Sequence, residues 1–397
     1  MLKLNARVPA IRDLDPFVAR IETSGDAPAD ETSAYLSRDP VAPVPAGHRA
    51  YFSLHEPAEV AAADAYVARL PESMSYLAEG DIVRVSPRVG EVWVVYRRGS
   101  PFNALLLTEQ CNSDCLMCSQ PPKAAADRHL VATYLDAIPL MDLQTPELGI
   151  TGGEPTLLGD ALFDILGACR DHLPQTALHM LTNGRLFQYL RLARRLADLR
   201  HPDLMLGIPL YSDLAYRHDF VVQAAGAFDQ TVRGLMNLAR CGVRIEIRIV
   251  LHAQTIDRLP QWAEFLARNL PFVEHVALMG LEMMGYVRMN LEGLWIDPAD
   301  YQSELRQAVE TLDRHGLNVS IYNHPLCLLP PDLWSFARKS ISDWKNEYLP
   351  VCEPCAVRSE CGGFFSSATL RTSSHIAPFA EHPLIQRATE VNQSFLS

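Results

Sequence analysis

The chain has 397 residues, enough for two or three domains, and its hydrophobic fraction of 48% is that of a folded globular protein. Its formal net charge of −12, without any basic run, argues against a nucleic-acid partner because phosphates would be repelled. No stretch approaches the roughly 18 apolar residues of a membrane span, and no apolar signal-peptide core opens the chain. We therefore expect a cytoplasmic protein without a membrane partner, whose clustered cysteines are metal ligands rather than disulfides.

Residues 1–100 are expected to form an N-terminal α+β extension. Residues 27–46 are rich in Pro, Ala, Asp and Ser, a composition typical of a loop. Residues 56–70 predict an amphipathic helix. Alternation in 81–85 and 91–96 predicts two strands joined by a turn. Nothing here indicates chemistry, so the sequence favours packing against the rest of the chain over presentation of a substrate.

A short apolar run at 105–107 precedes three cysteines, Cys111, Cys115 and Cys118, in the spacing C-x3-C-x2-C. Soft thiolates suit iron–sulfur clusters, and three of them leave one iron of a [4Fe–4S] cubane without a protein ligand. That open iron can chelate the amino and carboxylate groups of S-adenosylmethionine (SAM). The alternatives are buried structural cysteines or a zinc site. Zinc, however, prefers four ligands, and no fourth Cys or His lies close by in the sequence.

This stretch resembles the radical SAM superfamily. Members usually have an aromatic residue before the last cysteine, where this chain has Met117. A polarizable methionine can fill the same apolar gap beside a cluster or SAM. The resemblance therefore implies a [4Fe–4S] cluster with an open iron, and SAM, as cofactors.

From residue 101 to 290, β-rich runs alternate with helical runs. Such alternation predicts an α/β fold of parallel strands with right-handed crossovers. Six units are too few for a closed eightfold barrel, and the resemblance implies a partial (β/α)6 TIM-type barrel that opens laterally. The predicted strands are 104–108, 148–151, 178–181, 204–210, 243–251 and 275–281, and the predicted helices include 161–172, 186–199, 230–241 and 259–269.

The second predicted strand ends in Gly152-Gly153-Glu154-Pro155. Paired glycines let the backbone approach a ligand closely, and a carboxylate there can hold an ammonium group. In the superfamily such a run contacts the amino group of SAM. We therefore expect these four residues to bind SAM.

Later strand ends carry further candidates for SAM binding. By resemblance, Asn183 in Thr-Asn-Gly contacts SAM, although a plain left-handed turn is the alternative. By resemblance, the hydroxyl of Ser212 touches the ribose. Arg248 has the charge to pair with the SAM carboxylate, or it forms a surface salt bridge along 244–248. Residues 279–286 flank the adenine or form plain core, and no general base is apparent.

From residue 291 the pattern changes to a helix at 299–315, a strand at 317–322 and a second cysteine group. Cys352, Cys355 and Cys361, in C-x2-C-x5-C-Gly with Cys327 upstream, form a strong metal signature. Four thiolates can close either a zinc site or a [4Fe–4S] cluster. Peptide-modifying radical SAM enzymes often carry an auxiliary cluster here, so the resemblance favours iron–sulfur. The predicted domains are thus an extension (1–100), a barrel (101–290), an auxiliary cluster domain (291–366) and a C-terminal tail (367–397).

Three stretches, 105–123, 323–327 and 344–365, look closer to one subfamily. They resemble the C-component maturase of the His-Xaa-Ser peptide system, over roughly residues 100–366. The resemblance implies an enzyme that cleaves SAM to a 5′-deoxyadenosyl radical, abstracts hydrogen from carbon and modifies, by a crosslink for example, a ribosomally made peptide with His-Xaa-Ser repeats. It also implies a second radical SAM maturase, a small accessory protein and an external electron donor as partners.

Two other functions stay open at this point. One is a radical SAM enzyme that acts on a small metabolite. The other is a non-catalytic metal-binding scaffold for a second maturase, which would have no use for the Gly-Gly-Glu-Pro run. In the enzyme, the auxiliary cluster would take back an electron or bind the substrate.

Overall fold

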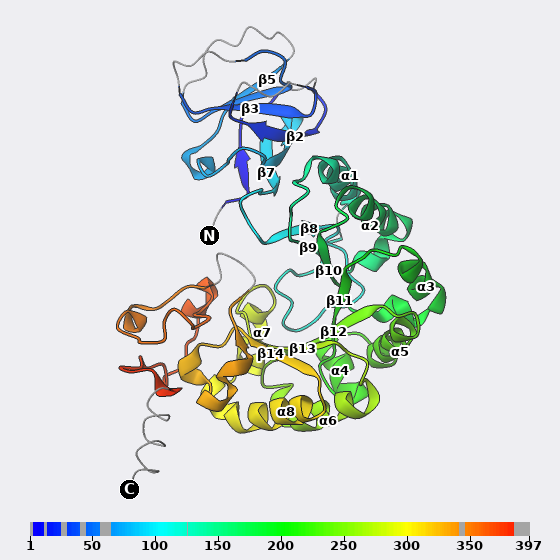
Figure 1. Ribbon diagram of the computed structural model, residues 1–397, viewed down its shortest axis with the longest axis vertical. Helices are drawn as coiled ribbons and strands as arrows, with labels where there is room; N and C mark the ends of the chain where they lie inside the picture. Colours follow the sequence, from blue (N-terminus) through cyan, green and yellow to red (C-terminus); the bar gives the residue numbers. More distant parts are fainter. Residues whose placement is uncertain are drawn as a thin grey trace. The chain divides into compact units, whose positions relative to one another are not determined.

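The computed structural model describes residues 3–11, 14–24, 30–39, 45–55, 65–124, 126–340 and 346–384 (Figure 1). The chain divides into two compact units. The first comprises Met1–Thr108, Ala125–His179 and Leu199–Leu204. The second comprises Glu109–Ala124, Met180–Asp198 and Met205–Ser397.

The first unit contains a seven-stranded sheet. Its strands are β1 Asn5–Arg7, β2 Phe17–Glu22, β3 Ser33–Ser37, β4 Ala50–Ser53, β5 Tyr66–Arg69, β6 Ile82–Ser86 and β7 Glu91–Tyr96, in the order β1-β7-β6-β2-β3-β4-β5. β2 to β5 pair in parallel, and β1, β7, β6 and β2 pair antiparallel. Each strand contributes apolar side chains to one cluster that includes Phe52, Tyr66 and Met74. Burial of this cluster holds the sheet together.

The helix predicted over 56–70 is wrong where the structure describes it, because Tyr66–Arg69 is strand β5. Tyr66 and Ala68 are buried while the residues after each are more exposed, which is the period of two of a strand. The rest of the prediction, 56–64, lies outside the described residues. Among the residues of 1–100 that the structure describes there are strands and short 3-10 turns but no α-helix, so only the β part of the predicted α+β extension is seen.

The loop predicted over 27–46 contains strand β3. β3 pairs with β2 on one side and with β4 on the other, and this pairing outweighs the local composition. The two strands predicted over 81–85 and 91–96 are confirmed by β6 and β7. A 3-10 turn at Pro87–Val89 joins them, as the sequence predicted.

The first unit continues with two parallel strands and two helices. These are β8 Asn103–Leu106, α1 Arg128–Ala137, β9 Glu147–Thr151 and α2 Asp160–His172, with β8 paired to β9. The phenol of Tyr96 lies 2.8 Å from the hydroxyl of Thr145, and Arg98 pairs with Asp142 at 2.5 Å. These contacts attach the seven-stranded sheet to the segment that leads into β9.

In the second unit, strands alternate with helices. β11 Leu204–Pro209, β12 Arg244–Leu251, β13 His275–Gly280, β14 Asn318–Tyr322 and β15 Ala337–Arg338 each pair in parallel with the next. The helices are α3 Leu190–Asp198, α4 Ala215–Val222, α5 Ala227–Arg240, α6 Leu259–Asn269, α7 Val287–Leu294 and α8 Gln302–Arg314. Figure 1 shows α5, α6 and α8 on one side of these strands. With β10 Ala177–Leu181, the strand order of the sheet is β15-β14-β13-β12-β11-β10-β9-β8.

The six strands predicted between residues 101 and 290 are confirmed as β8 to β13. Parallel pairing with intervening helices gives the predicted α/β fold and fits a partial TIM-type barrel. The sheet continues past the sixth strand, because the strand predicted over 317–322 becomes β14, paired to β13. The domain boundaries at residues 100, 290 and 366 stay predictions.

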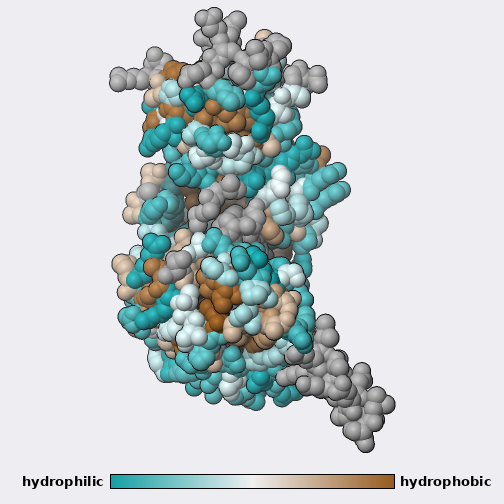
Figure 2. Space-filling model, turned by 90° about the vertical axis from the view of Figure 1, so that its left-hand side faces the viewer, coloured by the Kyte–Doolittle hydropathy of each residue, from teal (hydrophilic) through white to brown (hydrophobic). Residues whose placement is uncertain are grey.

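The surface in Figure 2 is mainly hydrophilic, with hydrophobic residues gathered in limited patches. This is the usual surface of a folded protein. In the part of the chain that the structure describes, no helix is both long enough and apolar enough to span a membrane.

Trp262 on α6 is fully buried and donates its indole N–H to the carbonyl of Leu210, at 2.9 Å, just after β11. Trp262→Ala should lower the free energy of unfolding by about 3–5 kcal/mol, because it leaves a cavity and an unpaired carbonyl. Chemical denaturation monitored by circular dichroism measures this loss. Glu264→Ala changes an exposed position of the same helix and should stay within about 0.5 kcal/mol of the parent. Equal losses in both variants would contradict the expectation.

Candidate functional site

The first three cysteines lie in the second unit, on the loop that follows β8. Cys111, Cys115 and Cys118 are all half-buried. Burial, and then the charges of Cys118 and Cys111, raise the pKa of Cys115 to about 12. Cys115 therefore lies within electrostatic range of both Cys118 and Cys111.

The C-terminus of α4 holds the middle of this cysteine loop. The amides of Asp114 and Leu116 donate to the carbonyls of Val222 and Val221, each at 3.0 Å. A helix end leaves its last carbonyls without partners inside the helix. Here the backbone amides of the loop are the missing donors, so these hydrogen bonds pair the last carbonyls of the helix and also fix the loop.

The turn after β10 holds the start of the cysteine loop. The side-chain carboxamide nitrogen of Asn183 donates to the side-chain carboxamide oxygen of Asn112 at 2.6 Å. Arg185 donates to the carbonyl of Asn112 and, at 3.0 Å, to the hydroxyl of Ser113. Gln230 on α5 accepts from the Arg185 side chain at 2.7 Å, which fixes its direction. The SAM contact of Asn183 stays a prediction, and the structure shows this residue hydrogen-bonded to the cysteine loop.

The segment before α7 holds the end of the cysteine loop. Gly285 has a positive φ of +55°, and a Cβ there would lie 2.2 Å from the carbonyl oxygen of Cys118. The amide of Tyr286 donates to that same oxygen at 2.9 Å. Asn290 on α7 donates to the carbonyl of Leu116 at 2.8 Å. Sequence reasoning missed these roles of Arg185, Gly285 and Asn290. Arg185 directly follows Thr-Asn-Gly, and Gly285 lies within the stretch 279–286 that the sequence predicts to flank the adenine or form core, whereas no signal pointed to Asn290.

Tyr211, just after β11, lies beside the cysteine loop. Burial and the charges of Cys115 and Cys118 raise its pKa, while Arg248 lowers it. His218 accepts a hydrogen bond from the amide of Tyr211 at 3.2 Å, and burial lowers the pKa of His218 to about 4. His218 is thus a neutral side chain of α4 that fixes the backbone of Tyr211 after β11.

Ser212 and Arg248 also lie in the second unit. Ser212 is buried, and its hydroxyl accepts from the amide of Leu214 at 3.2 Å. Arg248 lies 3.2 Å from the Glu246 carboxylate, which also contacts His275 at 2.6 Å. Arg248 therefore does form a salt bridge within 244–248, but this pair is largely buried and not at the surface, where the sequence allowed it. The SAM contacts of both residues stay predictions.

The Gly-Gly-Glu-Pro run lies in the first unit, directly after β9. The amide of Gly153 donates to the carbonyl of Thr108 at 2.8 Å, and a Cβ on Gly152 would lie 2.7 Å from that carbonyl oxygen. Glu154 is fully buried and accepts at 3.0 Å from the amide of Thr156. Pro155 opens the 3-10 turn that Glu154 caps. The glycines thus allow two chain segments to meet, and their contact with SAM stays a prediction.

The four cysteines of the second group line one cavity of about 320 Å³ in the second unit. Burial raises the pKa of Cys327 to about 11, and the charges of Cys361 and Cys352 add to the rise. Backbone amides point at the sulfur atoms: Leu326 donates to Cys361 at 3.3 Å and Phe379 to Cys355 at 3.5 Å. Such N–H···S contacts tune the reduction potential of iron–sulfur clusters.

Both cysteine groups offer the thiolate donors that an iron–sulfur cluster requires. Among the described residues, no group of three or more His, Cys, Asp or Glu side chains is placed to hold a single metal ion. A cubane makes a different demand, since each thiolate binds its own iron. Cys111, Cys115 and Cys118 would hold three irons of one cluster, and Cys327, Cys352, Cys355 and Cys361 would hold another.

Residues 105–266 match the family model of the radical SAM superfamily. This part of the chain, which includes the first cysteine group, is therefore a radical SAM domain. No curated protein matches the chain.

Several solved structures are similar to this chain. SuiB of Streptococcus suis bound to S-adenosylmethionine has 16% identity and a TM-score of 0.46, over 62% of this chain and 55% of that one. The enzyme anSMEcpe with bound AdoMet has 16% identity and a TM-score of 0.43, over 55% of this chain and 63% of that one. A radical SAM methyltransferase from Sphaerobacter thermophilus has 16% identity and a TM-score of 0.40, over 61% and 72%. The chain thus spans about half the length of SuiB.

Gly285→Ala should displace the cysteine loop, because the new methyl group would collide with the backbone of Cys118. We expect the iron content after anaerobic reconstitution to fall at least about threefold, since a shift of the loop separates the three thiolates. Gly293→Ala, on α7 with open space around its Cβ position, is the matched control and should keep its iron. Unchanged iron in Gly285→Ala would show that the loop tolerates the collision.

Proposed function

We propose that this chain, whose residues 105–266 form a radical SAM domain, is an enzyme that cleaves SAM reductively and modifies a ribosomally made peptide. The observation that carries the proposal is that residues 105–266 match the radical SAM family model. This matched segment contains Cys111, Cys115 and Cys118 on one loop. The resemblance of Gly152-Gly153-Glu154-Pro155 to the SAM-binding run of the superfamily also supports an enzyme over a scaffold that only binds metal.

When bound, a [4Fe–4S] cluster with one open iron supplies an electron to SAM and so generates a 5′-deoxyadenosyl radical. The residues of this chain supply position and shelter from water. Cys111, Cys115 and Cys118 would hold the cluster, and Glu154 would pair with the ammonium group of SAM. Arg248, whose guanidinium also contacts Glu246 and Met279, would pair with the SAM carboxylate.

Resemblance supports a peptide with His-Xaa-Ser repeats as the substrate. The stretches 105–123, 323–327 and 344–365 are those that resemble the C-component maturase of that peptide system. A second radical SAM maturase, a small accessory protein and an external electron donor are the partners that this assignment implies. Crosslinking is one modification that hydrogen abstraction from carbon allows.

The proposal includes an auxiliary [4Fe–4S] cluster on Cys327, Cys352, Cys355 and Cys361. Four thiolates that line one small cavity, with backbone amides aimed at two of them, support it. Zinc is the alternative for the same four ligands, and metal analysis of the purified protein separates the two metals.

Replacing Cys111, Cys115 and Cys118 together by Ala should abolish 5′-deoxyadenosine formation, because no thiolate then holds the SAM-binding cluster. The measurement is mass spectrometry of the small-molecule fraction after anaerobic reconstitution and addition of dithionite and SAM. Cys169→Ala, at a buried helical cysteine outside both groups, is the control and should keep the activity. A parent protein that contains only zinc and forms no 5′-deoxyadenosine would favour the scaffold.

Replacing the four auxiliary cysteines by Ala should leave 5′-deoxyadenosine formation intact while the peptide product disappears. The expectation follows because these cysteines line a cavity of their own. Mass spectrometry of a His-Xaa-Ser peptide incubated with each protein gives the product yield. An unchanged yield would remove both roles considered for the auxiliary cluster, electron acceptance and substrate binding.

A further inference from the structure

Strands β12, β13 and β14 have two different faces. The face on the side of α6 and α8 consists of buried apolar side chains, among them Ile247, Leu278 and Ile321 (Figure 1). Alternate residues of the same strands point to the opposite face, which in a barrel is its interior. That inner face carries a group of polar side chains on adjacent strands, Glu246, Arg248, His275, Ser320 and Tyr322.

Four of these side chains form one continuous set of hydrogen bonds. The Nδ1 atom of His275 lies 2.6 Å from the Glu246 carboxylate, and its Nε2 atom lies 2.9 Å from the Ser320 hydroxyl. Ser320 is in turn hydrogen-bonded to the Tyr322 hydroxyl, two residues further along the same face of β14. We call these four side chains, from Tyr322 to Glu246, the inner network.

The direction of these hydrogen bonds follows from the donors available. A carboxylate only accepts, so the Nδ1–H of neutral His275 donates to Glu246. The Nε2 atom then has a lone pair and accepts from the Ser320 hydroxyl, whose oxygen accepts from Tyr322. Burial raises the pKa of Tyr322, so the phenol keeps its proton at neutral pH. Each hydroxyl therefore donates toward His275, which is the arrangement needed to carry a proton from Tyr322 to the imidazole.

The inner network lies near the first cysteine group. Glu246 also pairs with Arg248, at 3.2 Å. Arg248 is within electrostatic range of Tyr211, and so are Cys115 and Cys118. A proton acceptor at this place is therefore close to the loop on which the SAM-binding cluster would be held.

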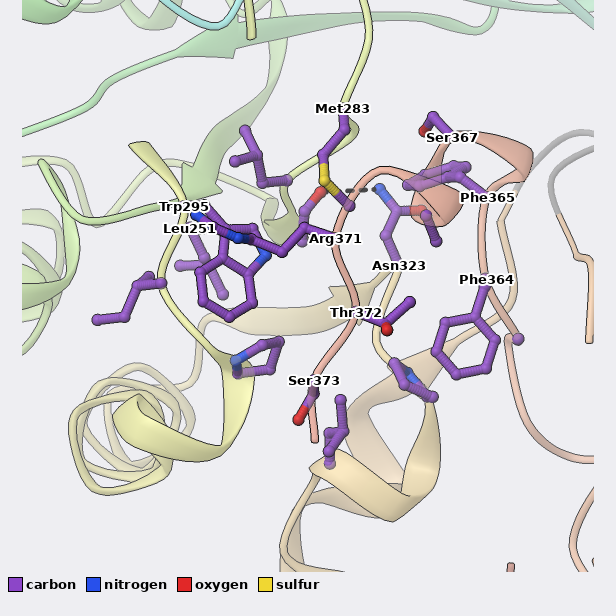
Figure 3. A pocket seen from close by; sticks show the side chains of 18 of the residues that line it. Leu251, Met283, Trp295, Asn323, Phe364, Phe365, Ser367, Arg371, Thr372 and Ser373 are labelled. Carbon is purple, nitrogen blue, oxygen red and sulfur yellow. Dashed lines mark hydrogen bonds between the residues drawn. The ribbon is translucent and has the colours of Figure 1, made fainter. Parts of the chain in front are cut away.

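The phenol end of the network is also the end nearer the carboxyl ends of the strands, where folds of this kind place their chemistry. Asn323 follows Tyr322 directly and lines a cavity at the strand ends together with Leu251 and Gly280 (Figure 3). Tyr322 is partly exposed, and the His275 side chain keeps 13% of its surface exposed. A proton can thus enter at the phenol and leave to water from the imidazole.

The order Ser–His–Glu is also that of a serine hydrolase triad. Such an enzyme needs an accessible serine and free backbone amides that stabilise an oxyanion. Ser320 is only 4% exposed and lies in the middle of β14, which pairs with β13 and β15. These surroundings favour proton transfer over nucleophilic attack by Ser320.

We propose that the inner network is the proton acceptor of this enzyme, and that it takes up, through the Tyr322 hydroxyl, the proton that the substrate releases when a new bond forms. The proposal rests on the proposed peptide-modifying function and adds a base for which the sequence offers no candidate. Tyr322 is the catalytic residue, because its hydroxyl meets the substrate. The other three members are positioning residues that act through it.

Hydrogen abstraction leaves the substrate with a carbon radical. When this carbon bonds to a second substrate group that carries an O–H or N–H, that group loses one proton and the adduct loses one electron. The electron passes to an acceptor of the iron–sulfur class. The proton passes to the Tyr322 oxygen as the Tyr322 proton moves to Ser320 and the Ser320 proton moves to Nε2 of His275. The imidazolium that results is paired with Glu246 and gives its proton to water.

The first test needs neither SAM nor peptide. Reconstituted full-length protein with ¹⁵N-labelled histidine is studied by NMR at pH 8, and His275→Gln identifies the His275 signals by their loss. The ring should carry its proton on Nδ1, hydrogen-bonded to Glu246, with Nε2 unprotonated. A proton on Nε2 would reverse the direction of the hydrogen bonds and overturn the proposal.

The second test follows the reaction. Tyr322→Phe and His275→Gln should each lower the ratio of modified peptide to 5′-deoxyadenosine at least about tenfold, because a general base typically contributes about 10²–10⁴-fold to its step. Mass spectrometry of a synthetic peptide of repeated His-Gly-Ser units and of the small-molecule fraction gives this ratio. Tyr189→Phe and His315→Gln, at exposed positions outside the network, are the matched controls and should keep the ratio within about twofold. Equal iron content and equal melting curves confirm that the variants fold.

Chemical rescue separates proton transfer from packing. In His275→Ala, added imidazole can occupy the space of the missing ring and accept the proton, so the ratio should rise at least about threefold. Pyrrole has a ring of the same size without a basic nitrogen and should not raise it.

Unchanged ratios in Tyr322→Phe and His275→Gln, in a parent protein that forms 5′-deoxyadenosine, would show that the proton acceptor alone is wrong. Equal rescue by pyrrole and imidazole would show the same, and labelling of Ser320 by a fluorophosphonate would identify a nucleophile instead. If the parent protein forms no 5′-deoxyadenosine, the proposed function itself fails, and the proton acceptor fails with it.

Discussion

Hydrogen bonds to a short cysteine loop are the constraint on which the rest of the site depends. The loop at 111–118 has few apolar side chains to bury, so hydrophobic packing alone cannot order it. Its order comes instead from hydrogen bonds to three elements. The end of α4 offers carbonyls, the turn after β10 offers a carboxamide and a guanidinium, and the segment around α7 offers a backbone amide and a carboxamide. Each such bond contributes only about 0.5–1.5 kcal/mol, so several are needed against the entropy cost of fixing the loop.

The parallel sheet makes this convergence possible. Strands that run the same way end at the same edge, and each is followed by a turn or helix start that can reach the loop. Asn183 follows β10, Tyr211 follows β11 and Gly285 follows β13, and all three lie near the cysteines. The same edge carries a cavity lined by Leu251, Gly280 and Asn323, at or just after the ends of β12, β13 and β14.

Pro325 and Phe364 lie between that cavity and the cavity of the second cysteine group. These two residues line both cavities, and Phe364 belongs to the run that begins at Cys361. This arrangement accounts for a cysteine-rich segment that folds back against the strand ends.

The sequence alone determined the strands β8 to β13, the alternation of strands and helices, and both cysteine groups, because periodicity and ligand spacing are local properties of the chain. It also placed Glu154 and its two glycines directly after a strand. Tertiary structure alone decided that 66–69 is a strand, that Asn183 and Arg185 hold the cysteine loop, and that Gly285 must be glycine. Those roles depend on which distant backbone atoms come within hydrogen-bond or collision distance. Such distances are set by the packing of the whole sheet, and no local pattern of residues encodes them.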